Sequence, residues 1–128
     1  RGKQMNEIEL VKQGYEAFSS GDMQRLGKLM AEDVKFTVNG DLPHDGAHTG
    51  MSEIIANCFS KIAESWSEFK VLPENYYQSG NTVFVTVDII AGKTKSKGVH
   101  MFVIENEKVV SFHGFEDNDQ MRKGLKAA

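Results

Sequence analysis

Cysteine, long apolar runs and excess positive charge are all scarce in this chain. The single cysteine, Cys58, excludes an intrachain disulfide and a cysteine-rich metal site. No apolar run is long enough for a membrane span and no signal-peptide pattern precedes the first predicted helix, so we expect a cytoplasmic protein. The net charge of −3 at pH 7 argues against nucleic acid or an anionic membrane as a partner.

Phosphate-binding loops are missing as well. No glycine-rich stretch has a recognised nucleotide-binding spacing, and we therefore expect no organic cofactor. What is present is an ordinary globular composition, with 40% hydrophobic and 26% charged residues in a chain of 128. That length can bury one sizeable core, so we predict a single domain over residues 6–128, preceded by a tail at 1–5.

Three amphipathic helices are predicted in the first half of the chain. Asn6 followed by Glu9 resembles a capping box, and apolar residues at helical spacing continue this helix to about residue 19. Asp22 is a candidate N-cap for a second, shorter helix. The third helix, at about 51–66, shows the most regular apolar stripe.

The remaining elements are predicted as strands. Val34, Phe36 and Val38 alternate with polar residues, as in a half-buried strand. Four further strands follow, at about residues 69–78, 82–91, 99–104 and 108–116, the last two as a hairpin. The order ααβαββββ indicates an α+β fold with helices on one face of an antiparallel sheet. Long strands should curl around the helices and leave a conical interior.

Three stretches carry a family resemblance: YEAFSSGDMQRLGKLMAEDVKF, then GAHTGMSEIIANCF, then KVVSFHGFED. Together they resemble the nuclear transport factor 2-like superfamily, in its SnoaL-like branch, which includes ketosteroid isomerase-like and polyketide cyclase-like proteins. The resemblance covers about residues 6–120. It implies a cystatin-like cone with a pocket for small hydrophobic ligands, and a homodimer packed through the outer face of the sheet.

The resemblance also implies positions for catalytic groups. The ketosteroid isomerase pattern places Tyr15 at the oxyanion-hole tyrosine and His100 at the protonated acid. Its general base falls on Val38, or on Asn39 if the register slips by one, and neither can act as a base. The catalytic aspartate of the cyclases falls near Gly114 and is also missing. The resemblance therefore implies a pocket with different polar groups and no true steroid isomerase activity.

Three residues are the candidate catalytic groups. His100 shares a strand face with Phe102, and its imidazole is suited to proton transfer near neutral pH. Tyr15 can stabilise an oxyanion, while Glu116 can orient His100 or act as a base. The structural alternatives are a satisfied buried histidine, a core aromatic residue and a solvated carboxylate at a strand end. The residues predicted to contact the ligand are Phe18, Trp66, Val83, Val85, Val87, Phe102 and Phe112.

The loop at 39–50, NGDLPHDGAHTG, carries His44, Asp45 and His48. Two imidazoles and a carboxylate can ligate a metal, but no regular element fixes their geometry, so we expect a mobile polar lid and no metal site. His113 is predicted on the outer sheet face, where packing in an interface is its expected role.

Two functions remain open. In the first, the pocket binds a small molecule with a carbonyl or enol oxygen and catalyses proton transfer, isomerisation or cyclisation. In the second, the protein is a non-catalytic ligand carrier, sensor or dimerisation module, which the loss of a base at Val38 supports. An enzyme should hold His100 and a carboxylate within reach of one cavity. A carrier should show isolated polar groups, and a dimerisation module a filled cone.

Overall fold

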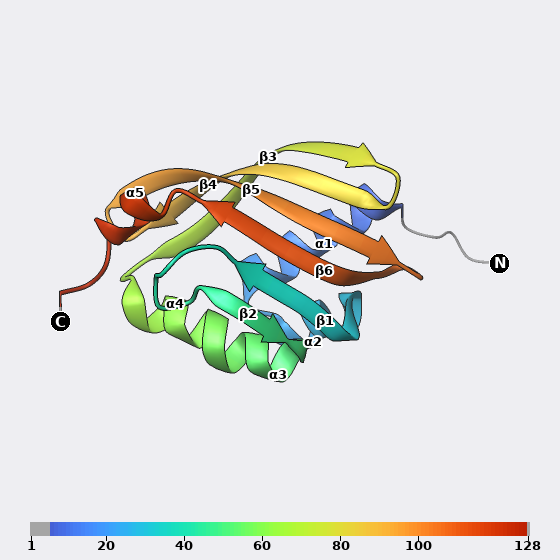
Figure 1. The fold of residues 1–128 in the computed structure, drawn as a ribbon, viewed down its shortest axis with the longest axis horizontal. Helices are drawn as coiled ribbons and strands as arrows, with labels where there is room; N and C mark the ends of the chain where they lie inside the picture. The colour runs from blue at the N-terminus through green and yellow to red at the C-terminus, as the bar shows by residue number, and fades with distance from the viewer. Residues whose placement is uncertain (1–5, 128) are drawn as a thin grey trace.

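A computed structural model describes residues 6–127, so the tail predicted at 1–5 lies outside the described residues. The elements follow the predicted order, with a short strand, a π-helical turn and a terminal helix in addition (Figure 1). They are α1 (Glu7–Ser20), α2 (Met23–Leu29), β1 (Met30–Val38), β2 (Gly46–Thr49), α3 (Gly50–Ile54), η1 (Ile55–Phe59), α4 (Ser60–Ser65), β3 (Phe69–Ser79), β4 (Thr82–Ala91), β5 (Thr94–Glu105), β6 (Lys108–Glu116) and α5 (Asn118–Arg122).

The strands form one curved sheet in the order β2-β1-β6-β5-β4-β3. The pairs β3–β4, β4–β5 and β5–β6 are antiparallel neighbours in sequence, as the meander of predicted strands requires. In contrast to the predicted antiparallel sheet, β1 pairs with β6 in parallel. Figure 1 shows α1 behind the strands and the α3–α4 helix below β1 and β2, so the sheet wraps around the helices.

The predicted helix starts are confirmed by their caps. The Asn6 side chain accepts a hydrogen bond from the backbone N–H of Glu9 at 2.8 Å, and Asp22 accepts one from the N–H of Arg25 at 3.0 Å. Between them, Gly21 ends α1 in the left-handed conformation, with φ of 72°. These caps fix where α1 presents its inward stripe to the sheet.

The third predicted helix runs through α3 and α4, but a π-helical turn, η1, interrupts it. Such turns are rare and insert one extra residue into the helical repeat. The predicted irregular loop at 39–50 also ends in regular structure, because β2 pairs with β1 and brings His48 opposite Phe36. Alternation of apolar residues is absent from this four-residue strand, so the sequence pattern did not indicate it.

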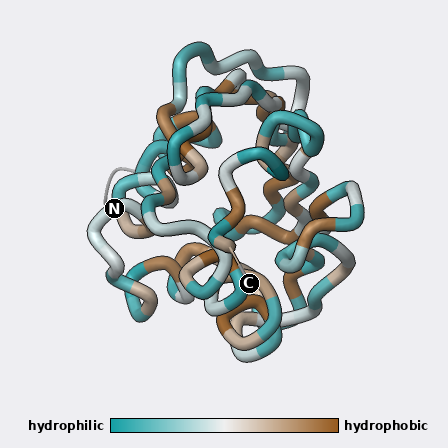
Figure 2. Tube along the Cα trace, turned by 90° about the vertical axis from the view of Figure 1, so that its left-hand side faces the viewer, coloured by the Kyte–Doolittle hydropathy of each residue, from teal (hydrophilic) through white to brown (hydrophobic). Residues whose placement is uncertain are grey.

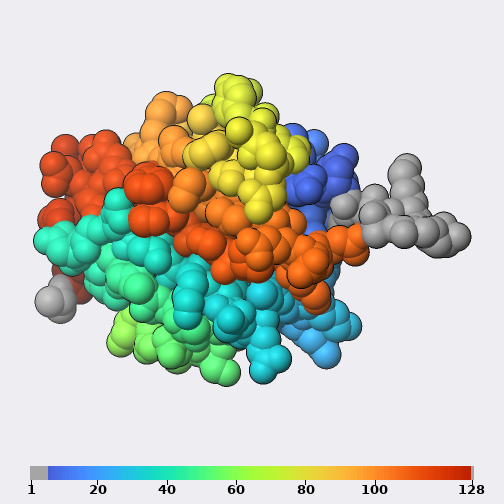
Figure 3. Space-filling model, turned by 45° about the vertical axis from the view of Figure 1, so that its right-hand side comes forward, coloured from blue at the N-terminus to red at the C-terminus, as the bar shows by residue number. Residues whose placement is uncertain are grey.

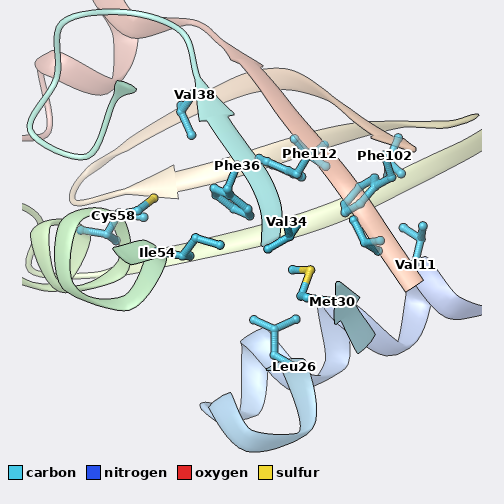
Figure 4. Close-up of a cluster of buried hydrophobic side chains, with 14 of the residues drawn as sticks. Val11, Leu26, Met30, Val34, Phe36, Val38, Ile54, Cys58, Phe102 and Phe112 are labelled. Atoms are coloured by element: carbon cyan, nitrogen blue, oxygen red, sulfur yellow. The ribbon is translucent and has the colours of Figure 1, made fainter. Parts of the chain in front are cut away.

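The core lies between the concave face of the sheet and the helices. Figure 4 shows Phe36 and Val38 of β1 pointing into the same interior as Ile54 and Cys58 of the third helix. In the hydropathy view, hydrophobic stretches gather inside and hydrophilic ones follow the outer turns (Figure 2). Among the described helices, none is both long and apolar enough to cross a membrane.

The convex face of the sheet is less completely covered. In Figure 3 the yellow, orange and teal segments, which include parts of β3, β4, β5 and β1, form one continuous surface. Register places five large apolar side chains on this face, and each is exposed: Leu72, Tyr77, Phe84, Val99 and Phe115.

Candidate functional site

A mainly apolar cavity lies between α1, the third helix and the concave face of the sheet. Aliphatic and aromatic side chains make up most of its wall, the aromatic ones including Phe18, Phe36, Phe59, Phe102 and Phe112. The polar side chains in the wall are Tyr15, His44, His100 and Glu116. Among the described residues that line the cavity, none is Lys or Arg.

His100 reaches this cavity because of its place on β5. It lies between Val85 of β4 and Gly114 of β6, and strand alternation turns its side chain inward. A Cβ at Gly114 would lie 3.3 Å from the Phe112 ring and 3.6 Å from His100 Cδ2. The missing side chain of Gly114 therefore leaves room for the imidazole beside Phe112.

Tyr15, His100 and Glu116, the three predicted catalytic residues, meet in this wall. The Tyr15 hydroxyl and His100 Nδ1 are hydrogen-bonded at 2.7 Å. On the other side of the ring, His100 Nε2 lies 3.7 Å from Glu116 Oε2, which is an ion-pair distance rather than a hydrogen bond. Within residues 6–127, His100 Nε2 has no hydrogen-bond partner. Glu116 is not a solvated strand end, since its side chain is only 6% exposed.

A second histidine, which sequence reasoning did not place in the site, also contacts Glu116. His44 Nε2 lies 3.1 Å from Glu116 Oε1 and 3.4 Å from Asp45 Oδ1. The predicted mobile lid is corrected here, because the side chains of His44 and Asp45 are 1% and 2% exposed. Asp45 closes the loop on itself by accepting the Leu42 N–H at 2.7 Å, which buries Leu42 and His44 together.

Other contacts keep this loop in place. His44 packs edge-on against Trp66, with ring centroids 5.2 Å apart. The His48 ring nitrogen Nε2 donates to the His44 carbonyl at 3.2 Å, and Asn118 of α5 donates to Asp45 at 3.2 Å. The only signal in the sequence for this burial was Leu42, an apolar residue inside a polar loop.

Burial and the two imidazoles set the charges of the site. Burial alone would raise the pKa of Glu116, but His100 and His44 beside the carboxylate outweigh it and lower the pKa to about 2. Burial raises the pKa of Tyr15 well above its usual range, so this phenol stays protonated. Burial likewise raises the pKa of Asp45. The site therefore holds one firmly ionised carboxylate and a neutral phenol around His100.

The remaining predicted residues divide into wall and core. Phe18, Phe102 and Phe112 line the cavity, whereas Trp66, Val83, Val85 and Val87 do not. These four are 0–2% exposed core residues. The three valines lie under α1, which packs over β3 and β4. Trp66 is turned toward α5, because its Nε1 donates a 3.1 Å hydrogen bond to the Met121 carbonyl.

His113 lies on the sheet face that its position predicted, and Cys58 lies in the interior. His113 points to the outer sheet face, where it contacts Asn39 at 2.7 Å and stacks on Phe115. Cys58 is buried, and burial raises the pKa of its thiol to about 12. A thiol that stays protonated is a poor nucleophile, so Cys58 acts as a small apolar group.

Solved structures share this fold over almost the whole chain. An NTF2-like protein of unknown function from Burkholderia pseudomallei is 25% identical, with a TM-score of 0.85, and the match covers 97% of this chain and 100% of that one. An NTF2-like protein from Burkholderia thailandensis is 18% identical, with a TM-score of 0.88 and coverages of 94% and 98%. TerC, co-crystallised with polyporic acid, is 17% identical, with a TM-score of 0.81 and coverages of 92% and 96%.

Sequence comparison gives the family directly. No curated protein sequence matches the chain. The family model of the SnoaL-like domain, however, matches residues 11–117, which include all six strands and the three residues Tyr15, His100 and Glu116. The resemblance carried by the three sequence stretches is thus confirmed, and the chain belongs to the SnoaL-like domain family of the NTF2-like superfamily.

Proposed function

We propose that this protein binds a small, uncharged molecule with a carbonyl or enol oxygen and catalyses a proton transfer on it, as in an isomerisation or ring closure. One observation carries the proposal: Tyr15, His100 and Glu116 follow one another as polar groups in the wall of a single apolar cavity. An apolar cavity with a few convergent polar groups is the usual form of a small-molecule site.

His100 is the acid–base group in this proposal. A carboxylate with a pKa of about 2 is a weak base, so Glu116 is suited to orient His100 and to balance an imidazolium charge. The breaking C–H bond next to the carbonyl would leave its electron pair on the ligand oxygen. Its proton would enter His100 at Nε2, the ring nitrogen that has no hydrogen-bond partner among the described residues.

Tyr15 is the proposed oxyanion donor. With Nε2 as the basic nitrogen, Nδ1 carries the ring proton and donates it to the Tyr15 oxygen. The hydroxyl proton of Tyr15 is then free to be donated to the enolate oxygen. Return of the proton from His100 to another carbon would complete an isomerisation.

The electrostatics of the wall support an uncharged ligand. With Glu116 ionised and neither Lys nor Arg among the described lining residues, a carboxylate ligand would face a buried negative charge without compensation. Polyporic acid, with which the structurally similar TerC was crystallised, is a useful comparison probe. As an acid it can carry a negative charge, and in that form it should bind this wall less well than an uncharged ketone does.

The test is exchange of carbon-bound protons with solvent. A panel of uncharged cyclic ketones, together with polyporic acid, is incubated with the protein in D₂O and followed by NMR. We expect enzyme-dependent deuterium uptake next to the carbonyl, lost in His100→Gln and kept in the control His113→Gln, which changes a histidine outside the cavity. Ligand binding without any exchange would favour the carrier function, for which Val38 at the position of the family base is the supporting observation.

We also propose a homodimer through the convex sheet face. The five exposed apolar side chains on that face lie on neighbouring strands, where Tyr77 pairs with Phe84 and Val99 with Phe115. Contiguous exposed apolar surface of this kind is typical of protein–protein contacts.

A further inference from the structure

Two carboxylates and two imidazoles are buried together at the end of the cavity where β6 meets the 39–45 loop. The side chains of His44, Asp45, His100 and Glu116 are between 1% and 6% exposed. Two buried carboxylates so close together repel one another unless a positive charge lies between them.

Three atoms of this cluster are also unsatisfied. His44 Nδ1, Asp45 Oδ1 and His100 Nε2 are buried and have no hydrogen-bond partner within the part of the chain that the structure describes. The other oxygen of Asp45 already accepts the Leu42 and Asn118 donors. Oδ1 is therefore left facing His44 Nε2, from which it is 3.4 Å away. A buried acceptor without a partner costs free energy, so its presence calls for a missing positive group.

The donor spacing matches a metal ion. His44 Nε2 lies 3.1 Å from Glu116 Oε1 and 3.4 Å from Asp45 Oδ1, and all three donors lie within 4.8 Å of one another. In a tetrahedral site with metal–ligand distances of about 2.0–2.1 Å, neighbouring donors are about 3.3 Å apart. The two separations from His44 Nε2 thus already stand near the distance that a shared ion imposes.

We propose that His44, Asp45 and Glu116 bind a divalent transition-metal ion of the Zn²⁺ type. Three protein ligands leave a fourth position open, and the unpartnered His100 Nε2 lies beside the cluster, 3.7 Å from the other Glu116 oxygen, Oε2. The ion would offset the charge of both carboxylates. An imidazole ligand favours Zn²⁺ or Ni²⁺ over Mg²⁺ and Ca²⁺, which take oxygen ligands.

This proposal goes beyond the proton-transfer function, which needs no metal. It also departs from the sequence-based expectation, which was a mobile lid without a metal site. The metal set considered there was His44, Asp45 and His48. In the structure His48 donates to the His44 carbonyl, and Glu116 of β6 joins His44 and Asp45 instead.

The test is direct metal binding, measured apart from activity. Protein dialysed against a chelator is titrated with Co²⁺ while its visible d–d absorption is recorded, and with Zn²⁺ by calorimetry. We expect one ion per chain and an intense tetrahedral Co²⁺ spectrum. Loss of a metal's outer-shell partner typically costs about 10–100-fold in affinity, so His44→Ala, which removes a direct ligand, should weaken binding at least that much.

Matched variants separate metal binding from folding. Asp45→Asn keeps an oxygen for the Leu42 N–H but removes the second anionic ligand, and it should weaken Zn²⁺ binding while retaining the circular dichroism spectrum. His113→Ala removes a histidine outside the cluster and should leave the Zn²⁺ affinity unchanged. A wild-type protein that binds neither ion at micromolar concentration would overturn the site, and so would a folded His44→Ala variant that binds Zn²⁺ as tightly as the wild type.

The two proposals can fail independently. Deuterium exchange by chelator-treated protein tests the acid–base function alone, whereas the Co²⁺ spectrum tests the metal site alone. Exchange without metal uptake would leave proton transfer standing and remove the metal site.

Discussion

The Tyr15 hydroxyl lies 2.7 Å from Nδ1 of His100, and the two rings face each other nearly in parallel, with centroids 5.9 Å apart. One residue comes from the first helix and the other from the fifth strand. Since a hydroxyl has only one proton, the Tyr15 hydroxyl points to the imidazole when Nδ1 carries no proton and away from it when Nδ1 carries one.

Replacement of this hydroxyl should separate catalysis from ligand binding. In Tyr15→Phe the ring keeps its contacts with Tyr76 and Phe102, but Nδ1 of His100 loses its partner. We expect deuterium exchange to fall roughly 100-fold, as for loss of one oxyanion donor, and stability to fall by about 1 kcal/mol. Exchange kinetics and urea unfolding measure the two effects. Unchanged exchange in the folded variant would remove Tyr15 from the mechanism.

Glu116 should matter more to stability than an exposed carboxylate does. Glu116→Gln replaces a buried charge that faces His44 and His100 with a neutral amide. Leaving buried polar groups poorly paired costs about 1–3 kcal/mol, so the urea midpoint should fall. Glu105→Gln, at an exposed position next to the β5–β6 turn, is the control and should leave the midpoint unchanged. Equal midpoints for the two variants would contradict the role given to Glu116.

Gly124 should tolerate no side chain. A Cβ there would lie 1.9 Å from the Ala91 carbonyl oxygen, and backbone cannot move away as a flexible side chain can. Gly124→Ala should therefore lower the thermal midpoint markedly. Gly14→Ala is the contrasting variant, because the nearest atom to its Cβ is Leu26 Cδ1 at 3.9 Å. In the middle of α1 it should stabilise the protein by about 0.5–1 kcal/mol. A Gly124→Ala variant as stable as the wild type would mean that the segment after α5 packs differently against Ala91.

The convex face should hold two copies together. Phe84→Lys places a charge in the centre of the exposed apolar residues of the sheet, and light scattering after size exclusion should show a shift from dimer to monomer. Ile55→Lys is a matched control, because Ile55 is 37% exposed against 36% for Phe84 but lies on the helical side. A wild-type protein that is monomeric at high concentration would contradict the homodimer.

Local patterns were enough to predict most of the fold. Asn6 and Asp22 act as the helix caps that their types predicted, and the alternation of Val83, Val85 and Val87 fixed which face of β4 is buried. The parallel pairing of β1 with β6 and the short strand β2 were not predictable, because each depends on contacts between distant segments.

The same limit applies to the site. Tyr15 lies on a helix stripe and His100 on a strand face, so periodicity alone directed both inward. His44 lies in a loop without periodicity, and its contact with Glu116 spans 72 residues. Its place is set by the turn that Asp45 closes and by Asn118 from α5, which no local pattern reveals.

The position of β6 has a consequence for how the protein is made. This strand is synthesised after the other five, yet it lies between β1 and β5 in the sheet. Until β6 leaves the ribosome, β1 and β2 have no strand pairing that joins them to the β3–β5 meander. The cavity then also lacks the wall formed by Phe112 and Glu116. A nascent chain released before residue 108 would thus expose two separate sheet fragments to chaperones and proteases, and the wall of the cavity closes only after β6 has been made.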